Sequence, residues 1–322
     1  MKVYVTQGHE KGIGLEVFFK SCLMLSEQEL GQLKLLAYQP AVVETLKAMR
    51  LPFKIHSHQL MLAGSGIAVE WLEQVKISPS FTSLELGMKL SESGGVLFTL
   101  PTSKDQFPKG NAGHTEYFRR FYRKPELTMF FSSPRLKVLL LSDHVAIADL
   151  SKNLTEETIY QRLSLALQTL KQWQWPTKRI LVSGFNPHAG ENGMIGNEDA
   201  RITKVVERLS SAQDLALAGP FPGDTMLIEQ KSPLDLLVYV FHDQGLGVFK
   251  GLQGFIGSNI TLGLPYPRFS PDHGTSFGLY GKNQADYRGC LYSLKEAISL
   301  LENISHGKDS SHQSQSPQSK KR

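Results

Sequence analysis

Three histidines of this chain each follow an apolar, strand-like run, and neutral imidazole is the commonest nitrogen ligand for a divalent metal. The runs and their histidines are LKVLLL at 136–141 with His144, RILVSGF at 179–185 with His188, and LDLLVYVF at 234–241 with His242. Ligands of open α/β sheets bind beyond the carboxyl ends of the strands, so we expect the three imidazoles at one edge of a sheet. Three ligands would leave coordination positions open for water or substrate, which a catalytic metal requires.

Two acidic residues, Asp143 and Asp243, adjoin two of these histidines. A carboxylate in that place can orient a ligating imidazole or accept a proton from a substrate. Taken singly, each histidine is more often a loop cap or a partner of a buried carbonyl than a ligand, and the three lie too far apart for a local metal motif. Their shared place after a strand is what favours a site, because independent capping does not predict it.

Other segments carry groups suited to anions. The turn at 8–14 holds three glycines between a short strand and a helix, but its order, G-x-x-x-G-x-G, is neither the Rossmann fingerprint nor the Walker A loop. A structural corner explains it equally well. Lys104, His114 and Thr115 would together make a cradle for a phosphate or carboxylate, although each alone is an ordinary surface residue. The glycine-rich stretch 241–289 suits loops that wrap around a ligand.

The hydrophobic pattern places these residues on an α/β fold. Apolar runs indicate strands at 3–6, 96–100, 136–141, 179–182 and 234–241, and amphipathic stretches indicate helices at 15–26, 82–93, 156–173, 199–210 and 291–301. Continuous apolar strands separated by helices favour a parallel or mixed sheet that is covered on both faces.

Composition excludes several classes of protein. The 322 residues, 41% hydrophobic and 20% charged, suit one large α/β unit or two domains. The net charge is +5, but residues 306–322 hold four basic residues against one acidic residue, which leaves only +2 for the body and argues against a nucleic-acid partner. No apolar run approaches the ~18 residues that would span a membrane. The polar tail at 306–322 should be disordered, and the two isolated cysteines and the polar N-terminus predict a cytoplasmic protein.

Short motifs along the chain carry a more specific resemblance. They are GIG at 12–14, TSK at 102–104, GHTE at 113–116, the His144 loop, NPHAGE at 186–191, GPFPGDT at 219–225, HDQG at 242–245, NITLGLP at 259–265 and DHGT at 272–275. In this set and order the chain resembles the 4-hydroxythreonine-4-phosphate dehydrogenase family of pyridoxal phosphate biosynthesis. That family includes relatives that oxidise other phosphorylated hydroxy acids.

The resemblance implies a fold like that of isocitrate and isopropylmalate dehydrogenases, with two α/β domains sharing a sheet and the active site in the cleft between them. Residues 1–110 plus 245–305 would form the nucleotide-side domain, and 111–244 the central domain with the metal ligands and the interface of a homodimer. The implied metal ligands, shared between subunits, are His144, His188 and His242, and the ion would be zinc, magnesium or cobalt.

The resemblance also implies the ligand-binding residues. His114, Thr115, Lys250, Asn259 and Arg268 would hold a small phosphorylated substrate. NAD or NADP would lie against Asn259, Leu262, Asp272, His273 and Gly274. Asp243, Asp224 and Lys250 are the candidates for catalysis, through proton transfer or charge neutralisation.

The implied reaction is oxidation, with decarboxylation, of 4-phosphooxy-threonine or a related phosphorylated hydroxy acid. The chain departs from the family pattern in the 8–16 loop, where both prolines are replaced, and at 276–283, where SFGLYGKN stands in place of a segment with an acidic residue. A second hypothesis is therefore a metal- and phosphoester-binding homologue that acts as a sensor or partner without efficient dehydrogenase activity. A third is a phosphate acyltransferase-like enzyme on a related fold.

Overall fold

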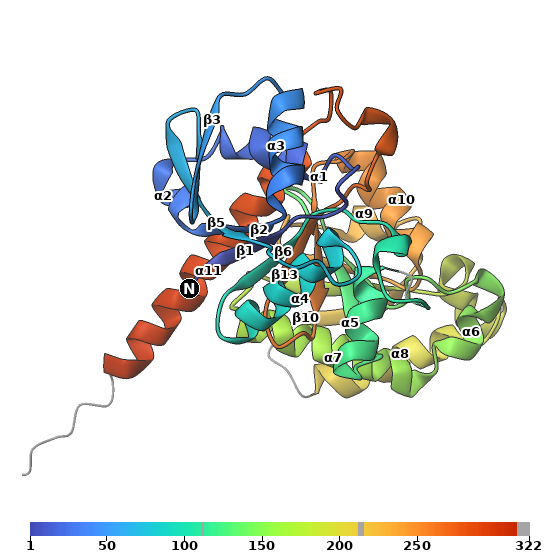
Figure 1. Ribbon diagram of the computed structural model, residues 1–322. Coiled ribbons are helices and arrows are strands. Elements are labelled where there is room, and N and C mark those ends of the chain that lie inside the picture. The colour runs from blue at the N-terminus through green and yellow to red at the C-terminus, as the bar shows by residue number, and fades with distance from the viewer. Residues whose placement is uncertain (111–112, 212–215, 314–322) are drawn as a thin grey trace, which may run out of the picture.

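One mixed sheet of 13 strands runs through the whole molecule (Figure 1). The computed structural model describes residues 1–110, 113–211 and 216–313. The strands lie in the order β10-β9-β11-β8-β7-β12-β13-β6-β1-β2-β5-β4-β3. Their bounds are β1 Val3–Thr6, β2 Leu33–Ala37, β3 Phe53–His56, β4 Gln59–Leu62, β5 Ser65–Trp71, β6 Val96–Thr99, β7 Thr128–Ser132, β8 Lys137–Leu140, β9 Arg179–Ser183, β10 Ala216–Phe221, β11 Leu236–Tyr239, β12 Ser258–Leu262 and β13 Arg268–Pro271.

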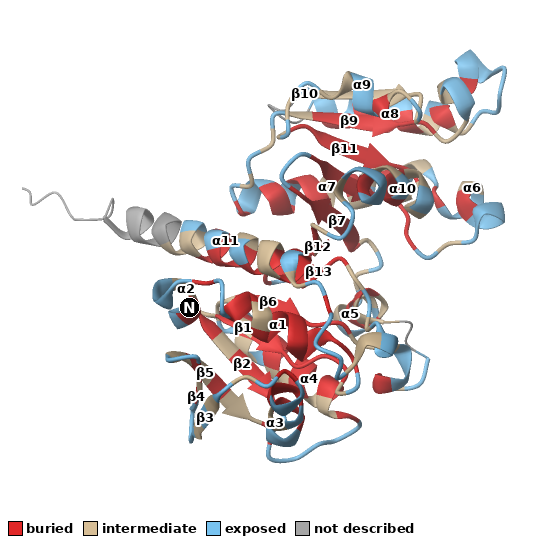
Figure 2. Cartoon of the chain, turned by 90° about the horizontal axis from the view of Figure 1, so that it is seen from above, coloured by how far each residue is buried: buried red, intermediate tan, exposed pale blue. Residues whose placement is uncertain are grey.

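Two parallel groups of strands flank an antiparallel centre. β13, β6, β1, β2 and β5 are parallel, as are β8, β11, β9 and β10, whereas β12 runs antiparallel to both of its neighbours, β7 and β13. Every residue of β6, β8 and β11 is buried, as expected for strands covered on both faces. The expected mixed sheet is confirmed, and Figure 2 shows the two groups on either side of β12 and β13.

Helices cover both faces of the sheet. They are α1 Gly14–Cys22, α2 Glu27–Gly31, α3 Gln39–Ala48, α4 Pro79–Glu92, α5 His114–Tyr122, α6 Leu150–Asn153, α7 Glu156–Gln172, α8 Asp199–Ser210, α9 Met226–Glu229, α10 His242–Gln253 and α11 Arg288–Gln313, with short 3₁₀ segments at Lys104–Gln106, Ile147–Asp149, Pro187–Gly193 and Phe277–Leu279. α11 packs along β12, β13, β6 and β1, so it crosses the centre of the sheet, while α4 packs on β1, β2 and β6. Among the described residues, no helix is both long and apolar enough to cross a membrane.

Packing departs from the expected boundaries at two places. α10 lies against β8 and β11, so residues 245–253 sit with the second group of strands. A Cβ on Gly245 would lie only 2.7 Å from Leu140 Cδ2, so glycine permits this close approach. α11 continues to Gln313, although the composition predicts disorder from residue 306. Extension costs little once the packed part of a helix has formed. Residues 314–322 of the expected tail lie outside the described part of the chain.

Candidate active site

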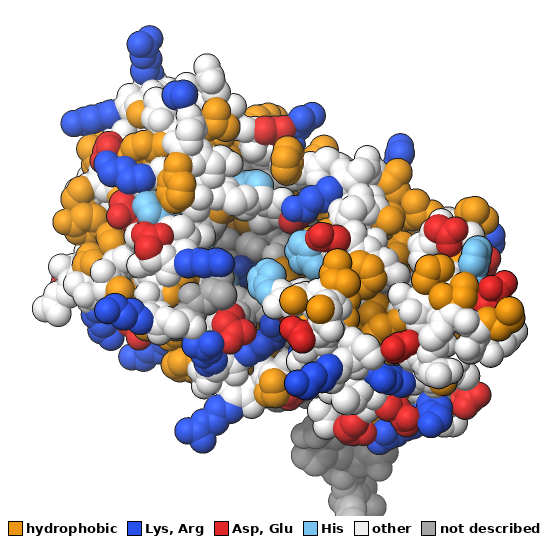
Figure 3. Space-filling model, turned by 90° about the vertical axis from the view of Figure 1, so that its right-hand side faces the viewer, with side chains coloured by type: hydrophobic (Ala, Val, Ile, Leu, Met, Phe, Trp, Pro, Cys, Tyr) orange, Lys and Arg blue, Asp and Glu red, His pale blue; other side chains and the backbone are white. Residues whose placement is uncertain are grey.

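Two of the three histidines meet at the carboxyl ends of neighbouring strands. His144 follows β8 and His242 begins α10 directly after β11, and their ring centroids are 6.0 Å apart. The His242 Nδ1–H donates to the Asp243 carboxylate at 2.7 Å, which leaves Nε2 to face a ligand. β9, β11 and β8 are adjacent and parallel, so the strand ends share one edge as the sequence predicts. Figure 3 shows histidine and basic side chains gathered around a hollow on this face.

The third histidine, His188, lies on a strained loop after β9 and is exposed. Residues 188–192 all have φ between 45° and 76°, although only one of them is glycine. Side chains other than glycine rarely adopt this conformation, and such strain persists where the surroundings enforce it. The Asp199 carboxylate fixes the residues just before this segment, because it accepts hydrogen bonds from the backbone N–H groups of Phe185 and Asn186 and from the Asn186 amide.

A metal ion needs more ligands than one described chain brings together. Within the described residues there is no group of three His, Cys, Asp or Glu side chains that could hold a metal. The His144–His242 pair has a spacing that suits two ligands of one ion, with Asp243 as the acceptor behind one ring. His188 is not part of this pair, so the proposed triad is incomplete within one described chain.

The His144 loop is fixed by a buried ion pair that the sequence analysis did not identify. Arg119 of α5 donates to both carboxylate oxygens of Asp143, at 2.9 and 2.7 Å, and also to the Leu127 carbonyl. Asp143 in turn accepts the backbone N–H of His144 at 2.9 Å. Burial works to raise the pKa of Asp143, but the hydrogen bonds and charge of Arg119 outweigh it and hold the pKa below its ordinary value. Asp143 is therefore an ionised, fully partnered support for His144.

A cavity of about 360 Å³ opens beside this pair, and we call it the anion cavity. It is lined by Thr99, Pro101, Thr102, Gly113, His114, Thr115, Glu116, Met129, His144, Lys250, Asn259, Arg268, Ser270, Pro271, Asp272, His273 and Gly274. These residues come from β6, α5 and the residue before it, β7, α10, β12 and β13, and from the segments that follow β6, β8 and β13. The cavity therefore lies at the junction of the two groups of strands. It contains all five residues expected to hold the substrate.

Arg268 is the strongest anion-binding feature of this cavity. Its side chain is 3% exposed, and its guanidinium donates to the hydroxyls of Thr99, at 2.6 and 3.0 Å, and Thr261, at 3.3 Å. Among the described residues, no carboxylate lies within ion-pair distance of it. Burial lowers the pKa of Arg268 to about 9, and both burial and Arg268 lower the pKa of His114. A buried cation without a counter-ion favours an anionic ligand.

Other polar atoms in the cavity also lack partners. Asn259 Oδ1, Asp272 Oδ2 and His273 Nε2 are buried without a hydrogen-bond partner among the described residues. Lys250 Nζ lies 3.5 Å from Asp272 Oδ1, and burial raises the pKa of Asp272 to about 6 against the opposing charges of Lys250 and His242. Buried polar groups are normally hydrogen-bonded, so this group of free atoms marks a place for a ligand.

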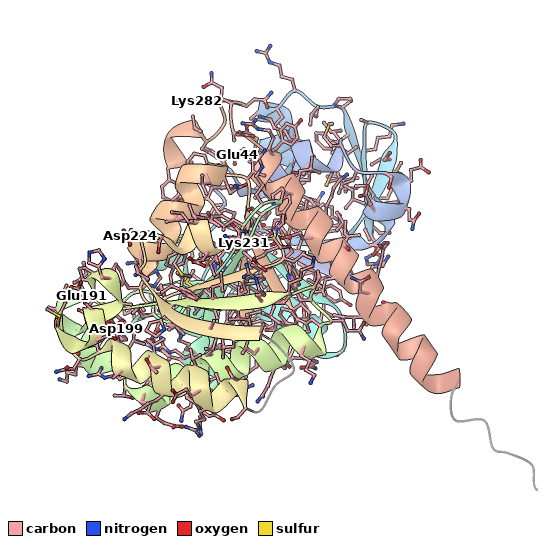
Figure 4. The ribbon with its side chains drawn as sticks, turned by 180° about the vertical axis from the view of Figure 1, so that it is seen from behind. Glu44, Glu191, Asp199, Asp224, Lys231 and Lys282 are labelled. Carbon is pink, nitrogen blue, oxygen red and sulfur yellow. The ribbon has the colours of Figure 1, made fainter. Side chains whose placement is uncertain are left out.

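Three predicted residues lie elsewhere. Leu262 is fully buried in the hydrophobic core and Lys104 is exposed, and neither lines the anion cavity. Asp224 is exposed on the turn between β10 and α9. Figure 4 shows Asp224 on the same side of the molecule as Glu191, apart from Glu44 and Lys282.

One further residue joins the strand ends and was not identified from the sequence as a separate feature. Gln244 accepts the backbone N–H of Val240 at 2.9 Å and the Ser183 hydroxyl at 3.1 Å, and donates to the Gly184 carbonyl at 3.0 Å. It thereby ties the end of β9 to the start of α10. The HDQG motif was the available signal, because it placed an amide directly after a histidine at a strand end.

Solved structures of two other proteins share the fold of this chain. A β-decarboxylating dehydrogenase from Thermococcus kodakarensis shares the fold, with a TM-score of 0.54 at 13% identity over 94% of this chain and 83% of that one. A branched-chain phosphotransacylase from Enterococcus faecalis does so equally, with a TM-score of 0.54 at 13% identity over 94% of this chain and all of that one. The architecture is thus the isocitrate/isopropylmalate dehydrogenase-like fold, with the anion cavity at the strand ends.

The sequence identifies the family within this class. Residues 25–300 match the family described as pyridoxal phosphate biosynthetic protein PdxA, and the chain belongs to that family. It is 31% identical to a D-threonate 4-phosphate dehydrogenase from Cupriavidus necator, over 92% of this chain and 96% of that one. It is likewise 31% identical to a 4-hydroxythreonine-4-phosphate dehydrogenase from Pseudoalteromonas translucida, over 94% and 98%. The crystal structure of such a dehydrogenase from Klebsiella pneumoniae superposes with a TM-score of 0.79 at 26% identity, over 93% and 99%.

Proposed function

We propose that this protein oxidises a small phosphorylated hydroxy acid with NAD or NADP and a divalent metal, and that decarboxylation follows. The observation that carries the proposal is Arg268, a buried guanidinium in the anion cavity with no carboxylate partner in the described chain. A substrate with a phosphate and a carboxylate supplies the missing negative charge. The names of the family relatives supply the reaction class and the two candidate substrates.

Different residues of the cavity would bind different groups of the substrate. Arg268 and His114 lie together at one part of the cavity, where the charge of Arg268 acts on the imidazole, and they suit the phosphate. The Thr115 hydroxyl and the Asn259 amide offer hydrogen bonds to substrate oxygens. Lys250, which lines the same cavity and lies 3.5 Å from Asp272, would pair with the substrate carboxylate until it leaves as CO2.

Three carboxyl groups are candidates for proton transfer. Asp272, with a pKa of about 6 in the folded chain, can hold or release a proton near neutral pH and lies 3.5 Å from the Lys250 ammonium. Asp243 and Asp224 remain further candidates, the first because it accepts from His242. A bound divalent ion would supply Lewis acidity at His144 and His242, and a bound nicotinamide would accept the hydride. The nicotinamide would lie beside His273 and Gly274, which line the same cavity.

We propose that His188 of a second copy completes the metal site in a homodimer. Large apolar side chains are exposed next to each loop concerned: Ile147 (75%) near His144, Met194 (82%) near His188 and Ile228 (68%) near Asp224. Exposed apolar groups at a polar site are typical of a protein–protein interface. The domain division into 1–110 plus 245–305 and 111–244 stays a proposal, although residues 245–253 pack on β8 and β11 of the second part. A cytoplasmic location is also proposed, and the two buried free cysteines suit it.

Enzyme assays with both candidate substrates test the reaction. Purified protein, loaded with Zn²⁺, Mg²⁺ or Co²⁺, is incubated with 4-phosphooxy-threonine or D-threonate 4-phosphate and with NAD or NADP, and reduced nicotinamide is measured by its absorbance. Reduction with either substrate supports the proposal and selects the substrate. Binding of metal and phosphoester without reduction would favour the sensor hypothesis, and acyl transfer without nicotinamide would favour the acyltransferase hypothesis.

The origin of the third histidine can be tested by mixing two inactive variants. We expect His188→Ala and His242→Ala each to lose metal binding and activity without unfolding. If His188 acts across the interface, a refolded mixture regains about a quarter of the activity, because half the dimers are mixed and half of their sites are intact. If His188 acts within its own chain, no mixed site is intact and the mixture stays inactive.

A further inference from the structure

The edge of the sheet opposite the anion cavity holds a second pocket of about 220 Å³, which we call the back pocket. Lys137 at the start of β8, Trp175 before β9 and Leu234 before β11 line it at the amino ends of the strands, and Glu296 and Asn303 of α11 close it. α11 also packs on β12, β13, β6 and β1, so the back pocket lies where the second group of strands meets a helix anchored to the first.

Lys137 is a buried cation that the reaction at the other edge does not use. Its side chain is 9% exposed, and its ammonium donates to the Ser133 carbonyl. Among the described residues it has no ion-pair partner within 4 Å. Burial lowers its pKa, with Glu296 acting in the opposite direction. An ammonium carries three donors, so this one is left short of acceptors.

The nearby carboxylate is already occupied by other groups. Glu296 accepts hydrogen bonds from the hydroxyls of Ser132, Ser258 and Tyr292, the last at 2.8 Å. These three donors hold it in the wall of the pocket. The negative charge of Glu296 therefore raises the pKa of Lys137 from a distance, but the two groups form no ion pair within 4 Å.

A second donor in the pocket wall also lacks a partner. Trp175 Nε1 is buried with no acceptor in the described chain. Its ring is held by Phe130, edge to face at a centroid distance of 5.4 Å, and by Phe269 at 6.3 Å, so it cannot easily turn to find one. A buried, unpaired N–H destabilises the folded protein by about 1–3 kcal/mol relative to a paired one.

We propose that the back pocket is a second binding site, for a small carboxylate with a short apolar side chain. The carboxylate would take the free donors of the Lys137 ammonium, and the apolar part would lie against Trp173 and Leu234. A phosphate fits less well, because its second negative charge would face Glu296 with no second cation in the lining. The volume lies below the range of drug-sized sites, which limits the ligand to a few heavy atoms.

Tryptophan fluorescence offers a direct test. Of the three tryptophans, Trp173 and Trp175 line the back pocket, and Trp71 lies on β5 at the far part of the sheet. Trp71→Phe protein is titrated with isovalerate, L-leucine and inorganic phosphate. We expect a saturable change with one or both carboxylates at about millimolar concentration and none with phosphate. The absence of a saturable change with both carboxylates, or saturation by phosphate alone, would overturn the proposal.

Variants then assign the signal to the pocket. Lys137→Met should weaken carboxylate binding at least tenfold and keep the fold, since methionine fills the same space without a buried charge. Lys178→Met, which removes an exposed lysine just before β9, is the matched control and should bind normally. Equal affinity in Lys137→Met would contradict the site. If that variant does not fold, Ser299→Phe, which adds a ring to the pocket lining from an exposed position of α11, should abolish binding, and unchanged binding there would equally contradict the site.

The two carboxylates also distinguish the sources of the ligand. If L-leucine binds and isovalerate does not, the ligand is an amino acid and Glu296→Gln should weaken its binding, because the ammonium needs that carboxylate. If both bind alike, the carboxylate alone is recognised. Either result supports the site, and neither depends on the reaction proposed for the anion cavity.

Discussion

The anion cavity and the 275–286 loop lie side by side, yet their polar groups are in opposite states. In the cavity, Arg268 has no carboxylate partner in the described chain, and Asn259, Asp272 and His273 each have a buried atom without a hydrogen bond. In the loop, the Tyr280 hydroxyl, the Asn283 amide and the Asp286 carboxylate are each paired with another group of the protein. A polar group that is already paired gains little from a ligand. We therefore expect the cavity to bind a ligand and the loop to border the site without binding one.

The pairing of the loop involves the residues in which this chain departs from its family. The Tyr280 hydroxyl donates to Glu44 at 2.6 Å, and Lys11 Nζ lies 3.5 Å from the same carboxylate and 5.3 Å from the centre of the Tyr280 ring. Phe277 packs edge to face on His9 at 4.8 Å. The altered first loop and the altered 276–283 segment thus contact each other.

The largest effect that the comparison predicts is at Arg268. Arg268→Met removes the only buried guanidinium of the described cavity lining, and kcat/KM should fall by roughly 100-fold or more, from about 3 kcal/mol of lost binding to the substrate anion. The melting temperature should change little, because the variant also loses a buried charge. Arg208→Met, at a half-exposed arginine of α8, is the control. A fall in kcat/KM of less than threefold would show that Arg268 does not bind an anionic group of the substrate.

Asp272 should show the next largest effect, in stability as a function of pH. Its folded pKa of about 6 lies above the ordinary value near 3.9, so the folded state binds this proton more tightly than the unfolded state does. The stability from this group is complete below pH ~4 and is lost as the pH rises through 6, amounting to about 2–3 kcal/mol. Asp272→Asn should therefore be more stable than wild type at pH 8 and no more stable at pH 4, as measured by urea unfolding. The same difference at both pH values would contradict a raised pKa.

Asp143 sharpens the comparison, because it lies at the site but is fully partnered. It should act by positioning His144 and not by touching the substrate. Asp143→Asn loosens the Arg119 pair, and supporting contacts of this kind are worth about 10–100-fold in metal affinity. Calorimetric titration with Zn²⁺ measures this without any assay of activity. Asp286→Asn, which breaks an exposed pair with Arg288, should bind Zn²⁺ as wild type does; equal affinities in both variants would reject the positioning role.

The smallest effect is expected in the loop. Tyr280→Phe removes the hydrogen bond to Glu44, whose side chain is 57% exposed, so the free energy of unfolding should fall by about 1 kcal/mol or less. The KM for the nicotinamide should change less than threefold, because we expect the Tyr280 hydroxyl to make no contact with the cofactor. A tenfold rise in that KM with the substrate KM unchanged would make Tyr280 a contact of the cofactor and break the comparison.

The sequence predicted the strands β1, β6, β8, β9 and β11 and missed the others, for physical reasons that differ along the sheet. β8, β9 and β11 are continuous apolar runs because both of their faces are covered, and the pattern located all three. The strands β12 and β13 were missed. They carry Asn259 and Arg268, whose side chains line the anion cavity and interrupt the apolar pattern. At these positions a polar side chain is needed in the cavity, whereas a buried strand would be recognised by an apolar one.

The site was predictable in its parts and not in its assembly. Strand ends located His144 and His242, and motif order located the anion cavity. The strained conformation of residues 188–192 could not be foreseen, because four of the five are not glycine and such residues rarely adopt a positive φ. The Arg119–Asp143 pair joins residues 24 positions apart, and no local pattern announces such a contact.

The placement of β12 and β13 determines when during synthesis the active site can exist. These strands are among the last to leave the ribosome, yet they fill the centre of the sheet, between β7 and β6. Each flanking group of strands can begin to fold as soon as it is translated, because its own strands pair with one another. The two groups can be joined only after residue 271, the end of β13, has been synthesised. A chain that stops short of β13 would consist of two partly folded halves with exposed strand edges and no place to bind an anion, so the cell makes either the whole enzyme or an aggregation-prone fragment.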